Sequence, residues 1–179
     1  MSLTLVRLAI SGTPGTGKTA TASILASRGM DVVELNLFAN EHGLLGKIDR
    51  KRKAREIDVE KLDEALLKER TGDVVLVGHI AHFLSADRIV VLRTRPSVLR
   101  KRLEARDYSE SKVKENLEAE ACDVILIESL DRSKKVYEID TTERTPEETA
   151  DAIEDILAGK TKKYEPGHVD WSEEVLGWY

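Results

Sequence analysis

The strongest constraint on the fold is a glycine-rich segment near the start of the 179-residue chain, Gly12-Thr-Pro-Gly-Thr-Gly-Lys-Thr19. It lies between the apolar run 3–10, which suits a strand, and the small and apolar residues 19–27, which suit a helix. Glycines at this spacing let successive backbone N–H groups point inward and cradle the phosphates of a nucleotide. Lys18 would then reach the β- and γ-phosphates, and the Thr19 hydroxyl would face Mg²⁺. The segment therefore predicts a phosphate-binding loop at a helix N-terminus.

Alternating strand and helix patterns follow this loop. The continuous apolar runs at 73–77 and 88–92 are typical of strands buried on both faces of a parallel sheet, so helices must cover both sides. Residues 36–55 lack a sustained period, which predicts a mobile excursion rather than a core element. Strands are expected at residues 4–10, 30–35, 73–77, 88–92 and 136–139, and helices at residues 19–27, 57–70, from Pro96 onward, 110–130 and 145–157. The pattern predicts a doubly wound α/β fold, a five-stranded parallel sheet flanked by helices.

One P-loop domain is expected over residues 1–159, followed by a tail over residues 160–179. A chain of this length can bury a continuous core without disulfides or a structural metal. The tail holds both tryptophans and half of the four tyrosines. We expect these aromatic side chains to fasten the tail onto the domain, and a partner-binding peptide is the alternative.

Composition excludes several classes of protein. Cys122 is the only cysteine, so no disulfide framework or thiolate metal cluster is expected. We expect a cytoplasmic location for the same reason. The apolar N-terminal run is too short to span a bilayer, so no membrane role is expected. Charged residues make up 34% of the chain, with a net charge of −5 and both signs mixed, which does not suggest general nucleic-acid binding. Segment 47–55 is an exception, with six cations in nine residues, and is either a solvated loop or a binding surface.

The glycine-rich loop alone fits kinases, GTPases, ATPases and motors, so the reaction depends on its surroundings. The sequence has no guanine-reading Asn-Lys-x-Asp. Kinases that act on nucleoside monophosphates need mobile arginines, because the phosphoryl transition state spreads negative charge over oxygens that water must not reach. The arginine-rich stretch 93–106 suits such a closing lid, and a solvated helix face is the alternative.

Several separated segments together resemble the adenylate kinase isoenzyme 6 family, small nucleotide kinases of archaea and eukaryotes that are linked to small-subunit ribosome maturation. The tail, with Pro166-Gly and Val169-Asp-Trp171, looks like archaeal members in particular. The matching segments are the loop at 12–19, Val77-Gly-His79, Val91-Leu-Arg-Thr-Arg-Pro96, Arg102-Leu-Glu-Ala-Arg-Asp-Tyr108 and Asn116-Leu-Glu-Ala-Glu120.

This resemblance implies ATP and Mg²⁺ as cofactors, a monophosphate-binding segment at about 34–53 and a lid at about 105–115. Lys18 and Arg106 would be the catalytic residues, because they would neutralise charge on the transferred phosphoryl group. Thr19 would be the metal ligand, and the loop 140–145 would lie beside the adenine. The implied nucleotide-binding residues are Gly12, Gly15, Thr16, Gly17, Lys18, Thr19, Ala20, Arg106 and Thr145, and the implied substrate-binding residues are Glu34, Asn36, His79 and Arg93.

Two positions depart from the family pattern. Val77 stands where the family usually has an acidic residue, so Mg²⁺ would rely on Thr19, water, and Asp31 or Glu34. Asp107 follows the lid arginine where the family usually has Gly, and its carboxylate could pair with Arg106 and hold the lid open. His79 could position a phosphate or a water, or be a structural histidine. A metal pair of His79 with His82 is a weak alternative, because neither carboxylate nor cysteine accompanies the two histidines.

The sequence therefore favours an ATP-dependent nucleoside monophosphate kinase, with AMP as the preferred monophosphate, that converts AMP and ATP to two ADP and can also hydrolyse ATP. The alternative is a ribosome-assembly ATPase that binds a small-subunit ribosomal protein and pre-ribosomal RNA. The basic segment 47–55 and the absent acid at Val77 lean toward this second function. Phosphorylation of another small metabolite by the same fold is a third possibility.

Overall fold

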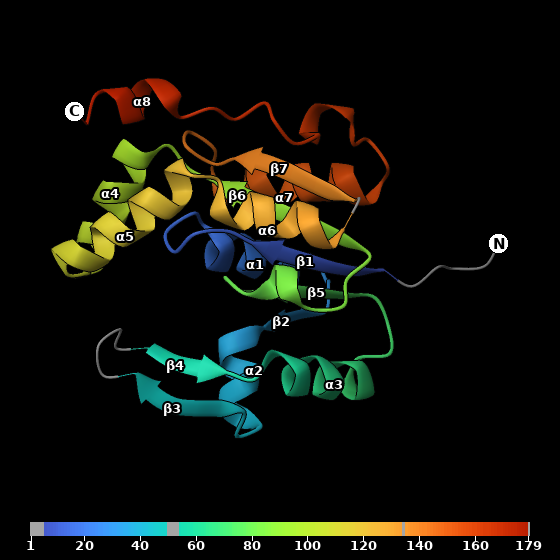
Figure 1. Ribbon diagram of the computed structural model, residues 1–179. Coiled ribbons are helices and arrows are strands. Elements are labelled where there is room, and N and C mark those ends of the chain that lie inside the picture. The colour runs from blue at the N-terminus through green and yellow to red at the C-terminus, as the bar shows by residue number, and fades with distance from the viewer. Residues whose placement is uncertain (1–5, 50–53, 134, 179) are drawn as a thin grey trace.

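The computed structural model describes residues 6–49, 54–133 and 135–178. Its centre is a five-stranded parallel sheet in the order β2-β5-β1-β6-β7 (Figure 1), which confirms the predicted fold class. The strands are β1 (Arg7–Ser11), β2 (Val32–Glu34), β5 (Val74–Val77), β6 (Arg88–Arg93) and β7 (Val136–Asp140). The glycine-rich loop leaves the carboxyl end of β1, the central strand, where the ends of β5 and β6 flank it.

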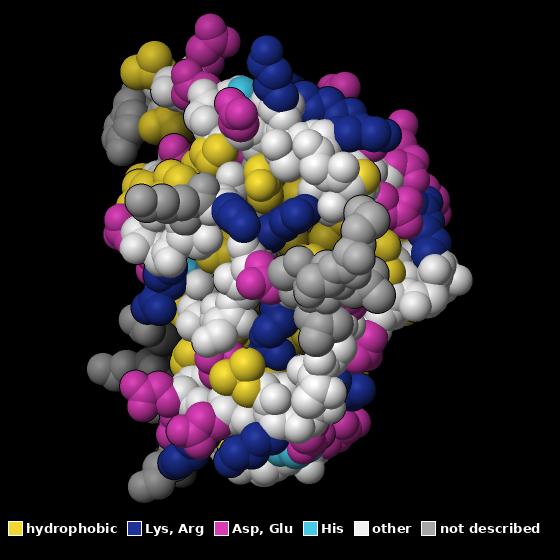
Figure 2. Space-filling view, turned by 90° about the vertical axis from the view of Figure 1, so that its right-hand side faces the viewer, with side chains coloured by type: hydrophobic (Ala, Val, Ile, Leu, Met, Phe, Trp, Pro, Cys, Tyr) yellow, Lys and Arg dark blue, Asp and Glu magenta, His cyan; other side chains and the backbone are white. Residues whose placement is uncertain are grey.

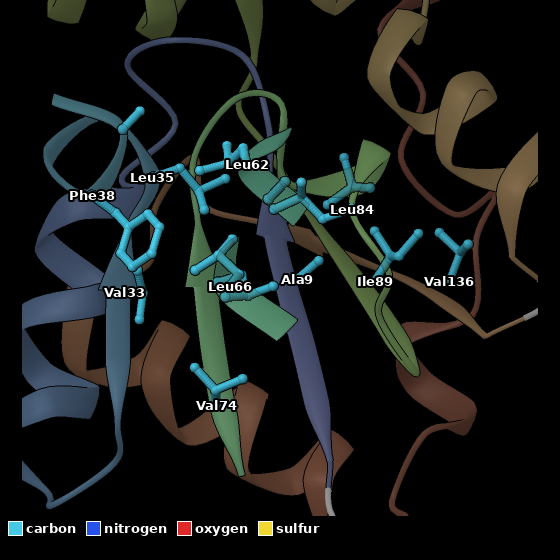
Figure 3. Packing of buried hydrophobic residues seen from close by; sticks show 14 of the residues in the cluster. Ala9, Val33, Leu35, Phe38, Leu62, Leu66, Val74, Leu84, Ile89 and Val136 are labelled. Atoms are coloured by element: carbon cyan, nitrogen blue, oxygen red, sulfur yellow. The ribbon is translucent and has the colours of Figure 1, made fainter. Parts of the chain in front are cut away.

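Helices cover both faces of the sheet, as its apolar strands require. Alternate residues of β1 point to opposite faces, so Leu8 and Ile10 join one hydrophobic cluster while Ala9 joins the other. Helices α1 (Lys18–Ser27) and α7 (Pro146–Leu157) pack on the Leu8 side. Helix α3 (Val59–Glu69) packs on the Ala9 side through Leu62 and Leu66, as Figure 3 shows. The short helix η1 (Ala81–Phe83) lies on this second side.

The excursion at 36–55 has more structure than its sequence pattern predicts. It contains helix α2 (Leu35–Glu41) and an antiparallel pair, β3 (Leu45–Asp49) with β4 (Ala54–Ile57). Phe38 and Ala39 are buried in the Ala9-side cluster, so the expectation that this region lies outside the core is wrong. A helix of seven residues, about two turns, is too short to show a sustained period. Residues 50–53 of the basic segment lie outside the described residues, so the role of that segment stays a prediction.

The prediction of a single long helix at 110–130 is also wrong, because two helices occupy that stretch. Helix α5 (Glu110–Ala121) ends at Cys122, and α6 (Val124–Arg132) begins after Asp123. Asp123 has a left-handed backbone with φ of +55°, which aspartate tolerates better than most residues. The apolar period continues across the break, so periodicity alone does not reveal it. Helix α5 packs against α4 (Pro96–Glu104) through Leu99, Leu103, Val113 and Leu117.

The C-terminal tail lies against the β7 and α4 side of the domain (Figure 1). It contains the short helices η2 (Lys162–Tyr164) and α8 (Ser172–Leu176). Tyr164 and Trp171 are buried, whereas Trp178 is 43% exposed. Two of its aromatic side chains are therefore buried.

The surface carries both signs of charge. On the face drawn in Figure 2, acidic and basic side chains are interspersed, in keeping with the mixed composition. Among the described residues, no helix is both long and apolar enough to cross a membrane.

Candidate active site

The backbone of the glycine-rich loop is shaped for close approach to a ligand. Gly12 has φ of +147°, and a Cβ there would lie 2.5 Å from the Leu92 carbonyl oxygen, so only glycine fits between β1 and β6. Gly17 has φ of +97° and caps α1 without any side-chain bond to the first N–H groups. Those N–H groups are therefore free to bind an anion, and the first turn of α1 contains no acidic residue. The loop fits the phosphates of a nucleotide.

Lys18 is held inside this loop by its own backbone. Its Nζ donates to the Gly12 carbonyl at 2.6 Å and to the Thr13 carbonyl at 2.9 Å. Burial lowers the pKa of Lys18 from 10.5 to about 7, although the Glu120 carboxylate opposes this shift. Burial without a directly bonded anion disfavours the cation, so the site favours a ligand that brings negative charge to Nζ.

This low pKa predicts that ATP binding takes up a proton above pH 7. Bound phosphates restore the Lys18 cation, whereas the free protein at pH 8 holds that amine mostly neutral. Calorimetry in buffers of different ionisation enthalpy should give an uptake of about 0.9 protons per ATP at pH 8 and much less at pH 6. The Lys18→Arg variant is the control, because its guanidinium stays protonated throughout. Equal uptake by the two proteins would contradict the low pKa.

A cavity of about 530 Å³ opens beside the loop. It is bounded by the ends of β2 and β5, by the segment after α4, where the lid is expected, and by one face of α5. The sequence-predicted residues that line it are Gly15, Gly17, Lys18, Thr19, Glu34, Asn36, His79 and Arg106. The other lining residues are Thr13, Pro14, Val77, Gly78, Tyr108, Lys112, Glu115, Asn116, Ala119 and Ile125. Tertiary structure thus brings the phosphate loop, the expected monophosphate segment and the lid arginine to one space.

The structure offers a carboxylate beside the position where Val77 lacks one. Glu34 pairs with Val77 in the parallel register of β2 and β5, and both residues line the cavity with Thr19. One carboxylate, one hydroxyl and phosphate oxygens suit Mg²⁺, which keeps several waters. Asp31, the other carboxylate considered, forms an ion pair with Arg70 at 3.6 Å and is not part of the lining. Of the two, Glu34 is therefore the residue that fits a metal-binding role.

The two neighbouring histidines occupy different environments. His79 lines the cavity, and burial together with the Lys18 charge lowers its pKa, so it stays neutral at pH 7. The His82 ring is buried, with Nδ1 at 2.8 Å from Ser11 Oγ and Nε2 at 2.9 Å from Glu128. Both nitrogens of His82 have partners in the protein, which removes it from the weak alternative of a metal pair. No metal-binding group of three His, Cys, Asp or Glu occurs among the described residues.

Arg93 does not reach the cavity, so its expected role in substrate binding needs correction. Its side chain is 2% exposed and is surrounded by carboxylates. It donates to Glu120 at 2.8 Å and to Glu138 at 2.7 Å, and it also contacts Asp123. Because these acids already accept from its N–H groups, the guanidinium bonds within the core and not to a ligand.

Other predicted nucleotide contacts also have structural partners. Thr145 caps α7 by accepting from the Glu148 N–H at 3.1 Å, in a reciprocal capping box, and it lies outside the cavity lining. Thr16 is buried and donates to the Thr13 carbonyl at 2.9 Å, so it shapes the loop. Gly12 also acts through loop shape, and Ala20 lies in the first turn of α1 outside the lining.

Sequence reasoning missed the supporting role of Arg102, which it considered only as part of the arginine-rich stretch 93–106. The Arg102 guanidinium donates to the carbonyls of Gly15 at 3.3 Å and Thr141 at 2.9 Å, so it joins the phosphate loop to the end of β7. Lys112 and Asn116 were also missed, although their spacing of four residues places them on one face of α5. That spacing was the available signal.

The lid arginine is free of the internal contact expected for it. Arg106 is exposed and lines the cavity. Among the ion pairs of the described residues none joins it to Asp107, so the expectation of a pair that holds the lid open is not met. Asp107 instead adopts a left-handed backbone with φ of +56°. The position therefore requires a conformation that glycine adopts without strain and that aspartate tolerates.

Solved structures with this architecture define the class of fold. Shikimate kinase from Acinetobacter baumannii, in complex with shikimate, superposes with a TM-score of 0.62 and 18% identity, covering 88% of this chain and 95% of that one. A family model described as an AAA domain matches residues 8–123. The chain has the P-loop kinase fold.

Closer relatives come from archaea. A protein of Archaeoglobus fulgidus named "Putative adenylate kinase" is 44% identical over 171 residues, covering 94% of this chain and 93% of the relative. A protein of Methanothermobacter thermautotrophicus with the same name is 44% identical over 172 residues, covering 95% of this chain and 99% of the relative. The chain belongs to this family of archaeal proteins.

Proposed function

We propose that the protein is an ATP-dependent nucleoside monophosphate kinase of the adenylate kinase isoenzyme 6 type, with AMP as its preferred monophosphate. The proposal rests on one observation. Lys18, Arg106, Glu34 and His79 all line the same cavity. Similarity to the archaeal adenylate kinase relatives supports the nucleotide as substrate.

The residues of the cavity divide the work of phosphoryl transfer. The N–H groups of the loop bind the β-phosphate region of ATP, and Lys18 and Arg106 neutralise negative charge on the transferred group. Thr19 and Glu34 would hold Mg²⁺, which when bound would supply positive charge against the phosphates. Asn36 and neutral His79 supply hydrogen bonds on the monophosphate side. The lid around Arg106 excludes water, which suppresses hydrolysis of ATP.

A coupled assay with purified protein, ATP, Mg²⁺ and each nucleoside monophosphate tests this proposal. We expect ADP formation that depends on AMP and exceeds the ATPase rate without it. Shikimate serves as a test of the third possibility, a different small metabolite. ATPase activity that a basic ribosomal protein stimulates, without AMP-dependent ADP, would favour the ribosome-assembly alternative. The absence of an acidic residue at Val77 no longer favours that alternative, because Glu34 lies beside Val77 on the neighbouring strand.

Replacing Glu34 by Gln is expected to raise the Mg²⁺ concentration needed for half-maximal rate by roughly tenfold, because the amide carries no charge for the metal. A Mg²⁺ titration at saturating ATP and AMP measures this. The Asp31→Asn variant is the matched control, since Asp31 lies outside the cavity lining. If Glu34→Gln leaves the Mg²⁺ dependence unchanged while Val77→Asp strengthens it, another group holds the metal.

Replacing Arg106 by Ala is expected to lower kcat by roughly 10²-fold or more, because the transferred phosphoryl group loses a charge partner. The melting temperature should stay unchanged, because Arg106 is exposed and has no ion pair among the described residues. Steady-state kinetics and a thermal melt on the same preparation separate the two effects. The exposed Arg100, on the preceding helix α4, provides the control, as Arg100→Ala should leave kcat unchanged. Equal kcat for both variants would refute the lid assignment.

A further inference from the structure

One buried carboxylate joins the phosphate loop to the C-terminal tail. Glu120, on α5, is 3% exposed, and both of its oxygens accept hydrogen bonds. Its Oε2 accepts from the Thr13 hydroxyl at 2.6 Å. Its Oε1 accepts from Arg93 Nε at 2.8 Å, from the Thr94 N–H at 3.1 Å and from the Trp171 indole N–H at 3.3 Å. Segments far apart in the sequence thus meet at one side chain.

The tail reaches the same carboxylate cluster at a second point. The Gly167 N–H donates to Glu138 Oε2 at 2.8 Å, and Arg93 donates to the other oxygen of Glu138 at 2.7 Å. Arg93 therefore lies between two acids that each accept a hydrogen bond from the tail. The tail also has an independent attachment, because Glu174 accepts from the Ser97 hydroxyl at 2.6 Å, away from this cluster.

Thr13 connects this cluster to the reacting part of the site. Its carbonyl accepts from Lys18 Nζ at 2.9 Å and from the Thr16 hydroxyl at 2.9 Å. The Thr13 residue also lines the cavity. A hydroxyl held by a buried carboxylate limits the motion of the residue whose carbonyl orients Lys18, and hydrogen bonds to a charged group are the strong ones.

We propose that Glu120 is a positioning residue for the phosphate loop and that the C-terminal tail is coupled to nucleotide binding through it. The inference rests on the proposed function, because it takes ATP as the ligand of the loop. The Thr13 hydroxyl and the Trp171 indole bond to the two oxygens of one carboxylate, so a movement of Glu120 at either bond when ATP binds changes the other. The docked tail thereby orders the loop before ATP arrives, and ATP favours the docked tail in return.

Trp171 itself provides a spectroscopic test. The chain has two tryptophans, so Trp178→Phe leaves Trp171 as the only one and should not alter activity. In this background we expect ATP to change the indole emission with the same Kd that calorimetry gives. Adding Thr13→Val should abolish most of the emission change at ATP concentrations that still saturate the protein. An emission change that is absent at saturating ATP, or unaltered by Thr13→Val, would overturn the coupling.

Kinetics separate coupling from simple support of the fold. Trp171→Phe keeps a ring but loses the N–H donor, and we expect the KM for ATP to rise roughly fivefold with kcat within twofold. Glu120→Gln should raise the same KM roughly tenfold or more, because both the charge and one acceptor oxygen are lost. In the Thr13→Val/Trp171→Phe double variant, the rise should be smaller than the product of the two single effects.

Glu174→Ala is the matched control, since it removes the acceptor of both the Ser97 N–H and the Ser97 hydroxyl and leaves the bonds of Glu120 unchanged. The proposal is overturned if Glu174→Ala raises the KM for ATP as much as Trp171→Phe, or if the double variant shows the full product. Absence of ATP binding by the unmodified protein would instead refute the proposed function, and the coupling with it. Calorimetry measures ATP binding directly, so it distinguishes these two outcomes.

Discussion

Replacing Lys18 by Met is expected to lower kcat/KM for phosphoryl transfer by roughly 10³-fold or more, the largest effect on activity of any single change. Lys18 is the cation whose ammonium lies inside the loop, bonded to the Gly12 and Thr13 carbonyls. A methionine side chain has similar length but provides neither a charge nor a donor for the β- and γ-phosphates. Steady-state kinetics with ATP and AMP would measure the loss.

The same variant should be no less stable than the unmodified protein. Burial lowers the pKa of Lys18 to about 7, so below pH 7 the folded state carries a poorly solvated cation that the unfolded state solvates. Between about pH 7 and 10.5 the unfolded chain binds more protons than the folded one, so the penalty is relieved as pH rises through this window. Thermal melts at pH 6 and pH 9 should therefore show a larger gain for Lys18→Met at pH 6. A fall in melting temperature at pH 6 would contradict the burial argument.

Replacing Arg93 by Met is expected to destabilise the fold by about 3–5 kcal/mol, the largest effect on stability. The change leaves Glu120 and Glu138, which are 3% and 0% exposed, without the cation between them. Buried carboxylates in that state lack a counter-charge and repel one another. Urea unfolding followed by circular dichroism at pH 7 measures the loss.

The control for this prediction is Arg100→Met. Arg100 forms an exposed ion pair with Glu104 at 3.7 Å, and such surface pairs contribute about 0–1 kcal/mol. Equal unfolding midpoints for the two methionine variants would show that the buried cluster contributes no more than a surface pair. Arg93→Lys is informative as well, because it keeps the charge but loses the planar fork that serves several acids at once.

Local chemistry explains which features were predictable. The phosphate loop, its strand and its helix were readable because glycine spacing, a preceding apolar run and a following lysine lie within a few residues of one another. The strands of the sheet, though not all of their ends, were also predictable, since apolar runs bounded by polar residues are local patterns. Helix α7 was predicted for the same reason, from the proline and acids that follow Thr145.

Features that depend on contacts between distant segments were not predictable. The sequence placed Arg93 with the substrate, since an arginine at the end of a strand looks the same whether it faces a ligand or three acids. The break at Asp123 was hidden because the apolar period runs through it. Glu34 could be preferred to Asp31 as a candidate metal ligand only because it lies in register with Val77 across β2 and β5.

Local sequence was enough to identify a P-loop at residues 12–19 on a parallel α/β sheet, because the chemistry of that loop is contained in eight consecutive residues. The other side chains that accompany the loop became known only from the folded structure. It brought Glu34 and Arg106 into the cavity, withdrew Arg93 into the core, and placed Trp171 on the carboxylate that holds Thr13. Strand register, burial and the sharing of the Glu120 carboxylate all depend on where distant strands and helices meet. No short stretch of sequence contains that information.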